Sequence, residues 1–164
     1  MAILLFLAAA AAAGPSAVPP LQAAVEEAIR DEIEFGIEAT VEQDIVRYME
    51  TVPADYRIVE EDGSITDRDT LRALQLQAWA IIPRTNALDI DVGRVEIGCE
   101  GACATVWTDQ RWDRQMLGRD GSSEHVVVTT QRHVERWEVR DGRWIQVSID
   151  ELGGTVIVDG QPYS

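Results

Sequence analysis

The apolar residues in the first part of the chain recur every three or four positions, which is the spacing of amphipathic helices. Six of them form two stripes: Val25, Ile29 and Ile33, and then Val41, Ile45 and Met49. Gly36 lies between the stripes and Pro53 follows the second one. We therefore expect two helices that separate at Gly36, the second ending before Pro53.

A short strand and a third helix are predicted next. The segment DYRIVEEDGS has the composition of a strand that closes in a turn at Asp62-Gly63. Thr66 with Asp69 has the pattern of a helix cap. The third helix is expected from Asp67 to about Ile82, because Pro83 cannot continue it.

From Asn86 onward the apolar positions alternate with polar ones, as in strands. Four segments with this pattern are joined by glycine-containing turns: ALDIDVGRVEI, ACATVWTDQRW, EHVVVTTQRHVERWEV and RWIQVSI. Gly93 interrupts the first alternation, which predicts a β-bulge and a bent sheet. Helices followed by a strand meander predict an α+β fold, with N-terminal helices packed on a curved antiparallel sheet in a single domain, residues 21–164.

Charge and composition exclude some classes of function. The 164 residues carry a formal charge of −15, so a phosphate backbone is repelled and nucleic acid is not an expected partner. All basic residues are arginine. Schiff-base or general-base chemistry on lysine is therefore excluded.

The first residues are typical of a secretory signal peptide. An apolar run from Ala2 to Ala13 precedes small residues, and Ala11-x-Ala13 satisfies the cleavage pattern, so residues 1–13 are assigned to the signal, with cleavage after Ala17 as the alternative. An uncleaved anchor is the other interpretation, although a spanning helix needs about 20 apolar residues. We expect a periplasmic or secreted protein that is not attached to the membrane once the signal is removed.

The two cysteines fit such a compartment. Cys99 and Cys103 flank the residues EGA in a tight-hairpin pattern, so their side chains are expected to face each other and form a disulfide. A metal site would need more ligands than two thiols without a nearby histidine. No metal and no cofactor are predicted.

The segment RHVERWEVRDGRWIQVSID, residues 132–150, predicts a hairpin with a two-residue Asp141-Gly142 turn. Pairing outward from that turn places four pairs on one face: Val139–Trp144, Trp137–Gln146, Glu135–Ser148 and His133–Asp150. The opposite face carries three others: Val134–Ile149, Arg136–Val147 and Glu138–Ile145.

The order of elements resembles the nuclear transport factor 2-like superfamily, in particular its SnoaL-like exported members. The motifs that carry the resemblance are EEDGS before a helix, ERWEVRDGRWIQVSI and the closing VDGQPYS. The resemblance implies a cystatin-like cone whose helices close a pocket over the concave sheet face, and a homodimer through the convex face. It places the base of the ketosteroid isomerases at Glu61, but their tyrosine and acid positions fall near Ile33 and Arg136, so we do not expect that reaction.

The resemblance also implies that Trp144 points inward, which favours the tryptophan-bearing face as the pocket, although the aliphatic face is the alternative. The residues assigned to ligand binding are Tyr48, Trp79, Trp112, Glu135, Trp137, Trp144, Gln146 and Ser148. Trp112 is preferred over Trp107 because their spacing lets only one face inward. His125 lies eight residues before His133, about 26 Å away along a strand, and is excluded from the site.

These features predict an exported protein that binds a small apolar molecule. The enzyme alternative is an isomerase, dehydratase or cyclase in which His133, oriented by Asp150, moves a proton. For this pair an ordinary cross-strand ion pair is the structural alternative. A dimeric interaction module without a ligand is the third possibility.

Overall fold

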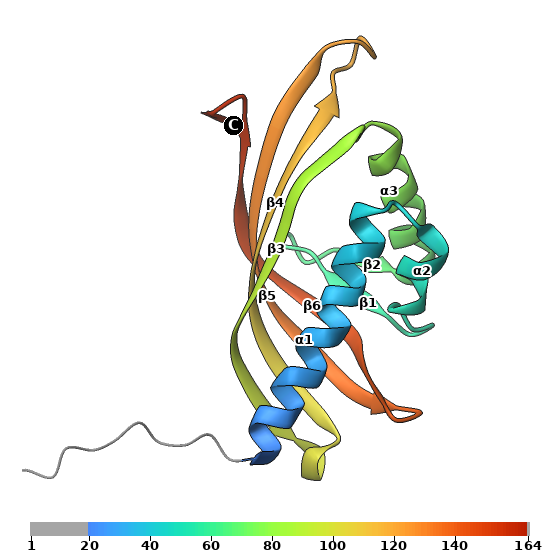
Figure 1. Ribbon diagram of the computed structural model, residues 1–164, viewed down its shortest axis with the longest axis vertical. Helices are drawn as coiled ribbons and strands as arrows, with labels where there is room; N and C mark the ends of the chain where they lie inside the picture. Colours follow the sequence, from blue (N-terminus) through green and yellow to red (C-terminus); the bar gives the residue numbers. More distant parts are fainter. Residues whose placement is uncertain (1–19, 164) are drawn as a thin grey trace, which may run out of the picture.

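The computed structural model describes residues 20–163. The predicted signal peptide and both of its cleavage sites lie outside these residues. Three helices precede the long strands and cover one face of a curved sheet (Figure 1). The predicted α+β fold is confirmed.

The first two helices separate at Asp44 and not at Gly36. Helix α1 (Pro20–Val41) continues through Gly36, and α2 (Ile45–Glu50) follows after Gln43, whose φ is 56°. The side chain of Asp44 caps α2 by accepting hydrogen bonds from the backbone N–H groups of Val46 and Arg47 at 3.0 and 3.1 Å. A glycine costs a helix only about 1 kcal/mol, so Gly36 does not end α1, whereas a capping carboxylate fixes a helix start.

Strand β1 (Arg57–Val59) and the turn at Asp62-Gly63 follow as predicted, with Gly63 at φ 83°. A second short strand, β2 (Ile65–Asp67), pairs with β1 and was not predicted. Helix α3 (Arg68–Ala80) is capped by Asp67, which accepts from the backbone N–H of Thr70 at 2.8 Å. The prediction of Thr66 as the cap was therefore wrong, because the Thr66 hydroxyl donates to Glu60 at 2.7 Å and the helix begins one residue later.

Four long strands build the sheet: β3 (Arg84–Gly98), β4 (Cys103–Leu117), β5 (Glu124–Arg140) and β6 (Arg143–Val158). The strand order is β2-β1-β6-β5-β4-β3, and a short β7 (Gln161–Pro162) pairs with β6. Only β1 and β6 run parallel among the described pairs. The four predicted strands are confirmed, but β6 runs past the expected end through Gly153-Gly154.

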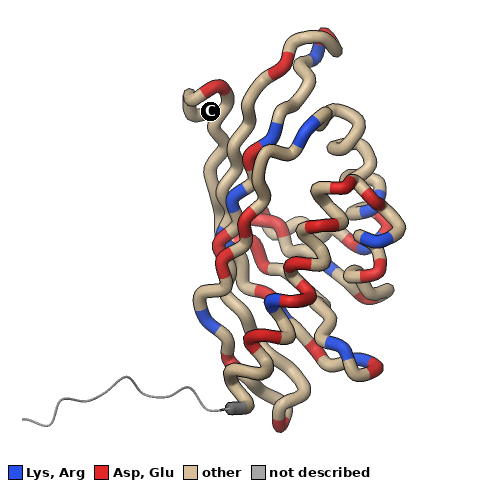
Figure 2. The backbone as a smooth tube through the Cα atoms, in the orientation of Figure 1, with Lys and Arg blue, Asp and Glu red and all other residues tan. Residues whose placement is uncertain are grey.

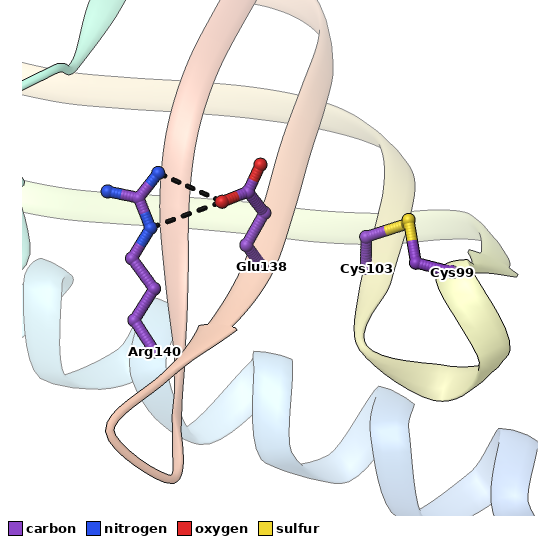
Figure 3. Close-up of a disulfide and its surroundings, with 4 residues drawn as sticks. All are labelled: Cys99, Cys103, Glu138 and Arg140. Carbon is purple, nitrogen blue, oxygen red and sulfur yellow. Dashed lines mark hydrogen bonds and ion pairs between the residues drawn. A yellow bond between two sulfur atoms is a disulfide. The ribbon is translucent and has the colours of Figure 1, made fainter.

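The tight connections of the sheet agree with their predictions. Cys99 and Cys103 form a disulfide across a single turn of 3-10 helix between β3 and β4 (Figure 3). Asp141 and Gly142, at φ 52° and 80°, form the β5–β6 turn. Beside that turn Arg140 pairs with Glu138 at 2.9 Å and with Asp55 at 2.6 Å.

Bulges set the curvature and the register of the sheet. The bulge predicted at Gly93 is present between Val92 and Arg94. Strand β6 contains a second irregularity, because Trp137 pairs with Gln146 whereas Arg136 pairs with Ser148. Val147 is thus an extra residue, and the pairs from Arg136–Ser148 to His133–Glu151 are displaced by one from the predicted register. A further irregularity between His133 and Gln131 displaces the later pairs once more.

Two hydrophobic clusters fix the helices to the sheet. In the first cluster, Val25 and Ile29 of α1 pack on buried residues of the strands, which are Val95, Ala104, Val106, Trp137 and Trp144. The second cluster, under α2 and α3, contains Met49, Val52, Tyr56 and Leu71.

Acidic residues outnumber basic ones along the chain, and several of them lie along α1 (Figure 2). No helix among residues 20–163 has the length and apolarity needed to cross a membrane.

Candidate functional site

A cavity of about 520 Å³ lies between the helices and the concave face of the sheet. Its apolar walls come from α1, the segment after α2 and the strands: Ile33, Ile37, Val52, Leu88, Ile90, Trp112, Trp137, Trp144 and Ile149. Gly36 lines it as well, and a Cβ there would meet only the Thr51 methyl group at 4.0 Å. The size and lining are those of a pocket for a small organic molecule.

Alternation along β4 and β5 fixes the order of side chains on the concave face. The facing residues, beginning at the core, are Val106 with Glu135, Thr108 with His133, Gln110 with Gln131, Trp112 with Thr129, and Arg114 with Val127. The cavity therefore has a core end, where α1 packs on the sheet, and a far end near Arg114.

Glu135 is the buried carboxyl group of the core end, with 2% of its surface exposed. Oε1 accepts a hydrogen bond from the Thr108 hydroxyl at 2.6 Å, and Oε2 accepts from the Trp137 indole N–H at 2.9 Å. Burial raises the pKa of Glu135, and the hydrogen bonds from Thr108, Trp137 and Gln146 oppose that rise. The group is held rigidly and is easier to protonate than an ordinary glutamate.

His133 lies beside Glu135 on the same face of β5 and is 6% exposed. Its Nδ1 is 4.0 Å from Glu135 Oε1, and its buried Nε2 has no hydrogen-bond partner among the described residues. Burial lowers the pKa of His133, whereas the nearby Asp109 raises it. A neutral imidazole in a cavity is a competent proton acceptor, and a carboxylate next to it stabilises the imidazolium that would form.

The predicted pairing of His133 with Asp150 was wrong. His133 pairs with Glu151, and Asp150 pairs with Val134 and does not line the cavity. The extra residue Val147 in β6 causes the difference, because a shift of one residue moves every later side chain to the other face. Glu151 takes the cross-strand place opposite His133 that was predicted for Asp150, and Glu135 lies beside His133 on the same strand.

Most residues assigned to ligand binding come together around the cavity. Six of the eight line it: Tyr48, Trp112, Glu135, Trp137, Trp144 and Gln146. Trp79 and Ser148 are buried outside it. Trp79 supports Tyr48 through an edge contact at 5.9 Å, and burial raises the pKa of Tyr48 to about 12. The binding roles of all these residues stay predictions.

The bulge also changes the predicted convex face. Ile149 lines the cavity and packs against the second hydrophobic cluster, so its assignment to an outer surface was wrong. Ile145, which precedes the bulge, pairs with Glu138 as predicted. Trp107, in contrast, stacks under Arg94 at 4.4 Å and does not line the cavity, as expected. His125 pairs with Asp159 at 2.7 Å near the far end of β5, away from His133.

Sequence reasoning missed several polar residues of the cavity. Tyr56 donates a hydrogen bond to Gln146 at 3.0 Å, and Gln131 donates to Glu151 at 3.1 Å. Gln110 and Arg114 line the cavity too. The signal for these two was available, because they flank Trp112 at a spacing of two residues on one strand.

Glu61 and Glu151 give one wall of the cavity an acidic character. Glu61 lies 3.3 Å from the position of a Cβ on Gly153, and the pKa of Glu151 is raised by burial and by the nearby Glu60. Within residues 20–163 no three His, Cys, Asp or Glu side chains are grouped closely enough to hold a metal ion.

Comparisons with known proteins support the fold. No protein-family model and no curated protein matches the sequence. A conserved protein from Planctomyces limnophilus superimposes with a TM-score of 0.68 at 16% identity, covering 83% of this chain and 98% of the other.

Two further structures carry enzyme names. A hexachlorocyclohexane dehydrochlorinase, LinA Type2, gives a TM-score of 0.62 at 14% identity, covering 84% of this chain and 91% of the other. A proposed scytalone dehydratase from Novosphingobium aromaticivorans gives 0.65 at 9% identity, covering 82% and 89%. A nuclear transport factor 2-like protein from Cytophaga hutchinsonii also matches. At these identities the likeness establishes the fold, which is nuclear transport factor 2-like.

Proposed function

We propose that this protein binds a small, largely apolar organic molecule in the cavity between the helices and the sheet. The observation that carries the proposal is the cavity itself, about 520 Å³ in volume, with aliphatic and tryptophan walls and a few directed polar groups. The disulfide and the apolar N-terminal run support an exported protein.

Filling the cavity tests this function. Ligand at 100 times its dissociation constant adds about 2.7 kcal/mol, which raises the melting temperature of a domain of this size by about 5–10 °C. We expect such a shift in a screen of small apolar compounds with the wild-type protein. In Gly36→Leu the new side chain occupies the cavity, so the shift should disappear.

Glu34→Leu is the matched control, because Glu34 is an exposed position on the same helix. It should keep the full shift. A shift that persists in Gly36→Leu would place the ligand elsewhere and contradict the proposal.

A second candidate function is proton transfer in an elimination or isomerisation. It is favoured by the contact of His133 with Glu135, in which a buried neutral imidazole and a buried carboxyl group line the same cavity. The names of the dehydrochlorinase and the dehydratase with this fold agree with such a reaction. His133 would accept the proton from a C–H bond, and Glu135 would stabilise the resulting imidazolium.

Hydrogen–deuterium exchange of a small ketone tests proton transfer without knowledge of the natural substrate. The probe is 2-tetralone in D₂O, whose protons next to the carbonyl group exchange through an enolate. We expect the protein to accelerate exchange, and His133→Ala to lower the acceleration by about 10²–10⁴-fold. His125→Ala should have no effect, and equal losses in both variants would contradict the role of His133.

A further inference from the structure

Arg114 is the one arginine among the described residues that line the cavity, and the chain contains no lysine. It is partly buried, and burial lowers the pKa of its guanidinium. Several other arginines pair with carboxylates, including Arg111 on the same strand, which lies 3.2 Å from Asp113. Arg114 has no carboxylate within 4.0 Å among residues 20–163. A partly buried cation without a counter-charge loses hydration that nothing replaces, which is unfavourable.

The geometry of the guanidinium leaves its Nε–Nη2 edge without a hydrogen-bond partner among the described residues. Nη1 donates to the Thr129 hydroxyl at 2.9 Å, and the group lies over the Trp112 ring with Cζ 4.2 Å from the ring centroid. No hydrogen bond from Nε or Nη2 occurs among the described residues, and Nε is buried. These two atoms form one side of the arginine fork, which binds a carboxylate through two parallel hydrogen bonds.

The other unpartnered atoms point to the same kind of ligand. Four buried side-chain polar atoms have no partner in the described part of the chain, and all are nitrogens: Gln75 Nε2, Trp79 Nε1, Arg114 Nε and His133 Nε2. Three of them, in Gln75, Arg114 and His133, belong to residues that line the cavity. Gln75 Nε2 and Arg114 Nε are donors, so a ligand that satisfies them must carry acceptor oxygens, whereas His133 Nε2 donates or accepts according to its tautomer.

The charges of the cavity also give the ligand a direction. Glu151 pairs with His133, four residues along the sheet from the Trp112–Thr129 level where the Arg114 guanidinium lies. Four residues of strand span about 13 Å. Glu151 thus lies beside His133, and Glu61 lies against Gly153, next to the Gly154 that pairs with Gln131, so both are displaced along the sheet from the Trp112–Thr129 level. An anionic group is attracted to Arg114 and repelled from the opposite end.

We propose that the ligand is an organic acid whose carboxylate binds the guanidinium of Arg114 while its apolar body lies along Trp112 toward His133. This inference rests on the proposed binding function and adds its ligand class. The span of about 13 Å fits an acid with one or two rings or a chain of comparable length.

Pairs of compounds that differ only in charge test the proposal by calorimetry. The probes are 2-naphthoate with 2-naphthamide and 4-phenylbutyrate with 4-phenylbutyramide, at pH 8. We expect the wild-type protein to bind each acid about 10- to 100-fold more tightly than its amide, as a charge-assisted bidentate contact provides. Arg114→Gln should abolish this preference by weakening the acid alone, and Arg114→Lys should keep part of it.

Arg111→Gln is the control, because it removes a surface arginine of β4 that does not line the cavity. It should leave both affinities unchanged. The melting temperature of Arg114→Gln without ligand should equal or exceed that of the wild type, whereas a structural role of Arg114 would lower it.

The outcomes separate the two proposals. If acids and amides bind the wild type equally, or if Arg114→Gln weakens both members of a pair by the same factor, the carboxylate inference is wrong while the binding function stands. If no compound of either pair binds, the proposed function fails and the inference fails with it. Loss of acid binding in Arg111→Gln as well would indicate a general effect of surface charge.

Discussion

The two ends of the same four strands have different interiors. At the core end, Val25 and Ile29 of α1 fill the concave face against Val106 and Trp137, and a disulfide closes the adjacent β3–β4 turn. Further along the strands, the side chains on the same concave face line a cavity. The alternation of apolar and polar residues in a strand is therefore compatible with a packed core and with a pocket.

Helix α1 determines whether a packed core or a pocket forms over the concave face. The first half of α1 presents Val25 and Ile29 to the sheet, whereas its second half presents Gly36 and Thr40, on either side of Ile37, to the cavity. Small and polar residues on a helix leave space that large aliphatic ones would fill. His133 and Glu135 lie at the boundary, buried by the core on one side and facing the cavity on the other.

Shortening one α1 side chain at the core end and one at the cavity end should give the largest difference in stability. Ile29 is fully buried, so Ile29→Ala should lower the free energy of unfolding by about 2–5 kcal/mol. Ile37→Ala, which enlarges an existing cavity, should cost only about 1 kcal/mol because little packing is lost. Urea denaturation measures both values, and equal losses would mean that the cavity end is packed as tightly as the core.

Loss of the disulfide should have an intermediate effect. Replacing both Cys99 and Cys103 by serine frees a short loop and should lower the free energy of unfolding by about 2 kcal/mol. Because the disulfide lies at the core end, ligand affinity should be unchanged when measured well below the melting temperature. A change in affinity of the folded variant would show that the two ends are coupled.

The smallest effect is expected at the boundary, from Glu135→Gln. At neutral pH we expect a change within about 1.5 kcal/mol, the size of a typical net hydrogen bond, because the amide can still accept from Trp137. The pH dependence is more informative. Burial raises the pKa of Glu135, so the folded protein holds this proton at pH values where the unfolded chain has released it.

The stabilisation from Glu135 is therefore complete below its ordinary pKa of 4.5 and is lost as the pH rises through the raised value. Glu135→Gln has no carboxyl group to release a proton and does not lose stability in this way. The stability of the variant relative to the wild type should therefore increase from pH 4 upward. His133 acts in the opposite direction, since its lowered pKa removes stability as the pH falls below 6.5, and it is present in both proteins. A difference that stays constant with pH would contradict the buried-carboxyl interpretation.

Local patterns in the sequence were sufficient for much of the fold. The alternation of β3 to β6, the Asp141-Gly142 turn, the bulge at Gly93 and the disulfide are all encoded by adjacent residues. The inward direction of Trp112 also follows from spacing alone. These features depend on backbone conformations that a few neighbouring side chains select.

Tertiary packing decided the partner of His133. The extra residue Val147 lies where β6 begins its pairing with the distant strand β1, next to Ile149 and the cluster under α2. No local pattern marks this bulge, because it arises from contacts between segments about 90 residues apart in the chain. The sequence alone determined which residues face one another near a turn and that Glu135 shares a face with His133, and only the folded sheet, with its accumulated register shifts, determined that Glu151 and not Asp150 lies opposite His133.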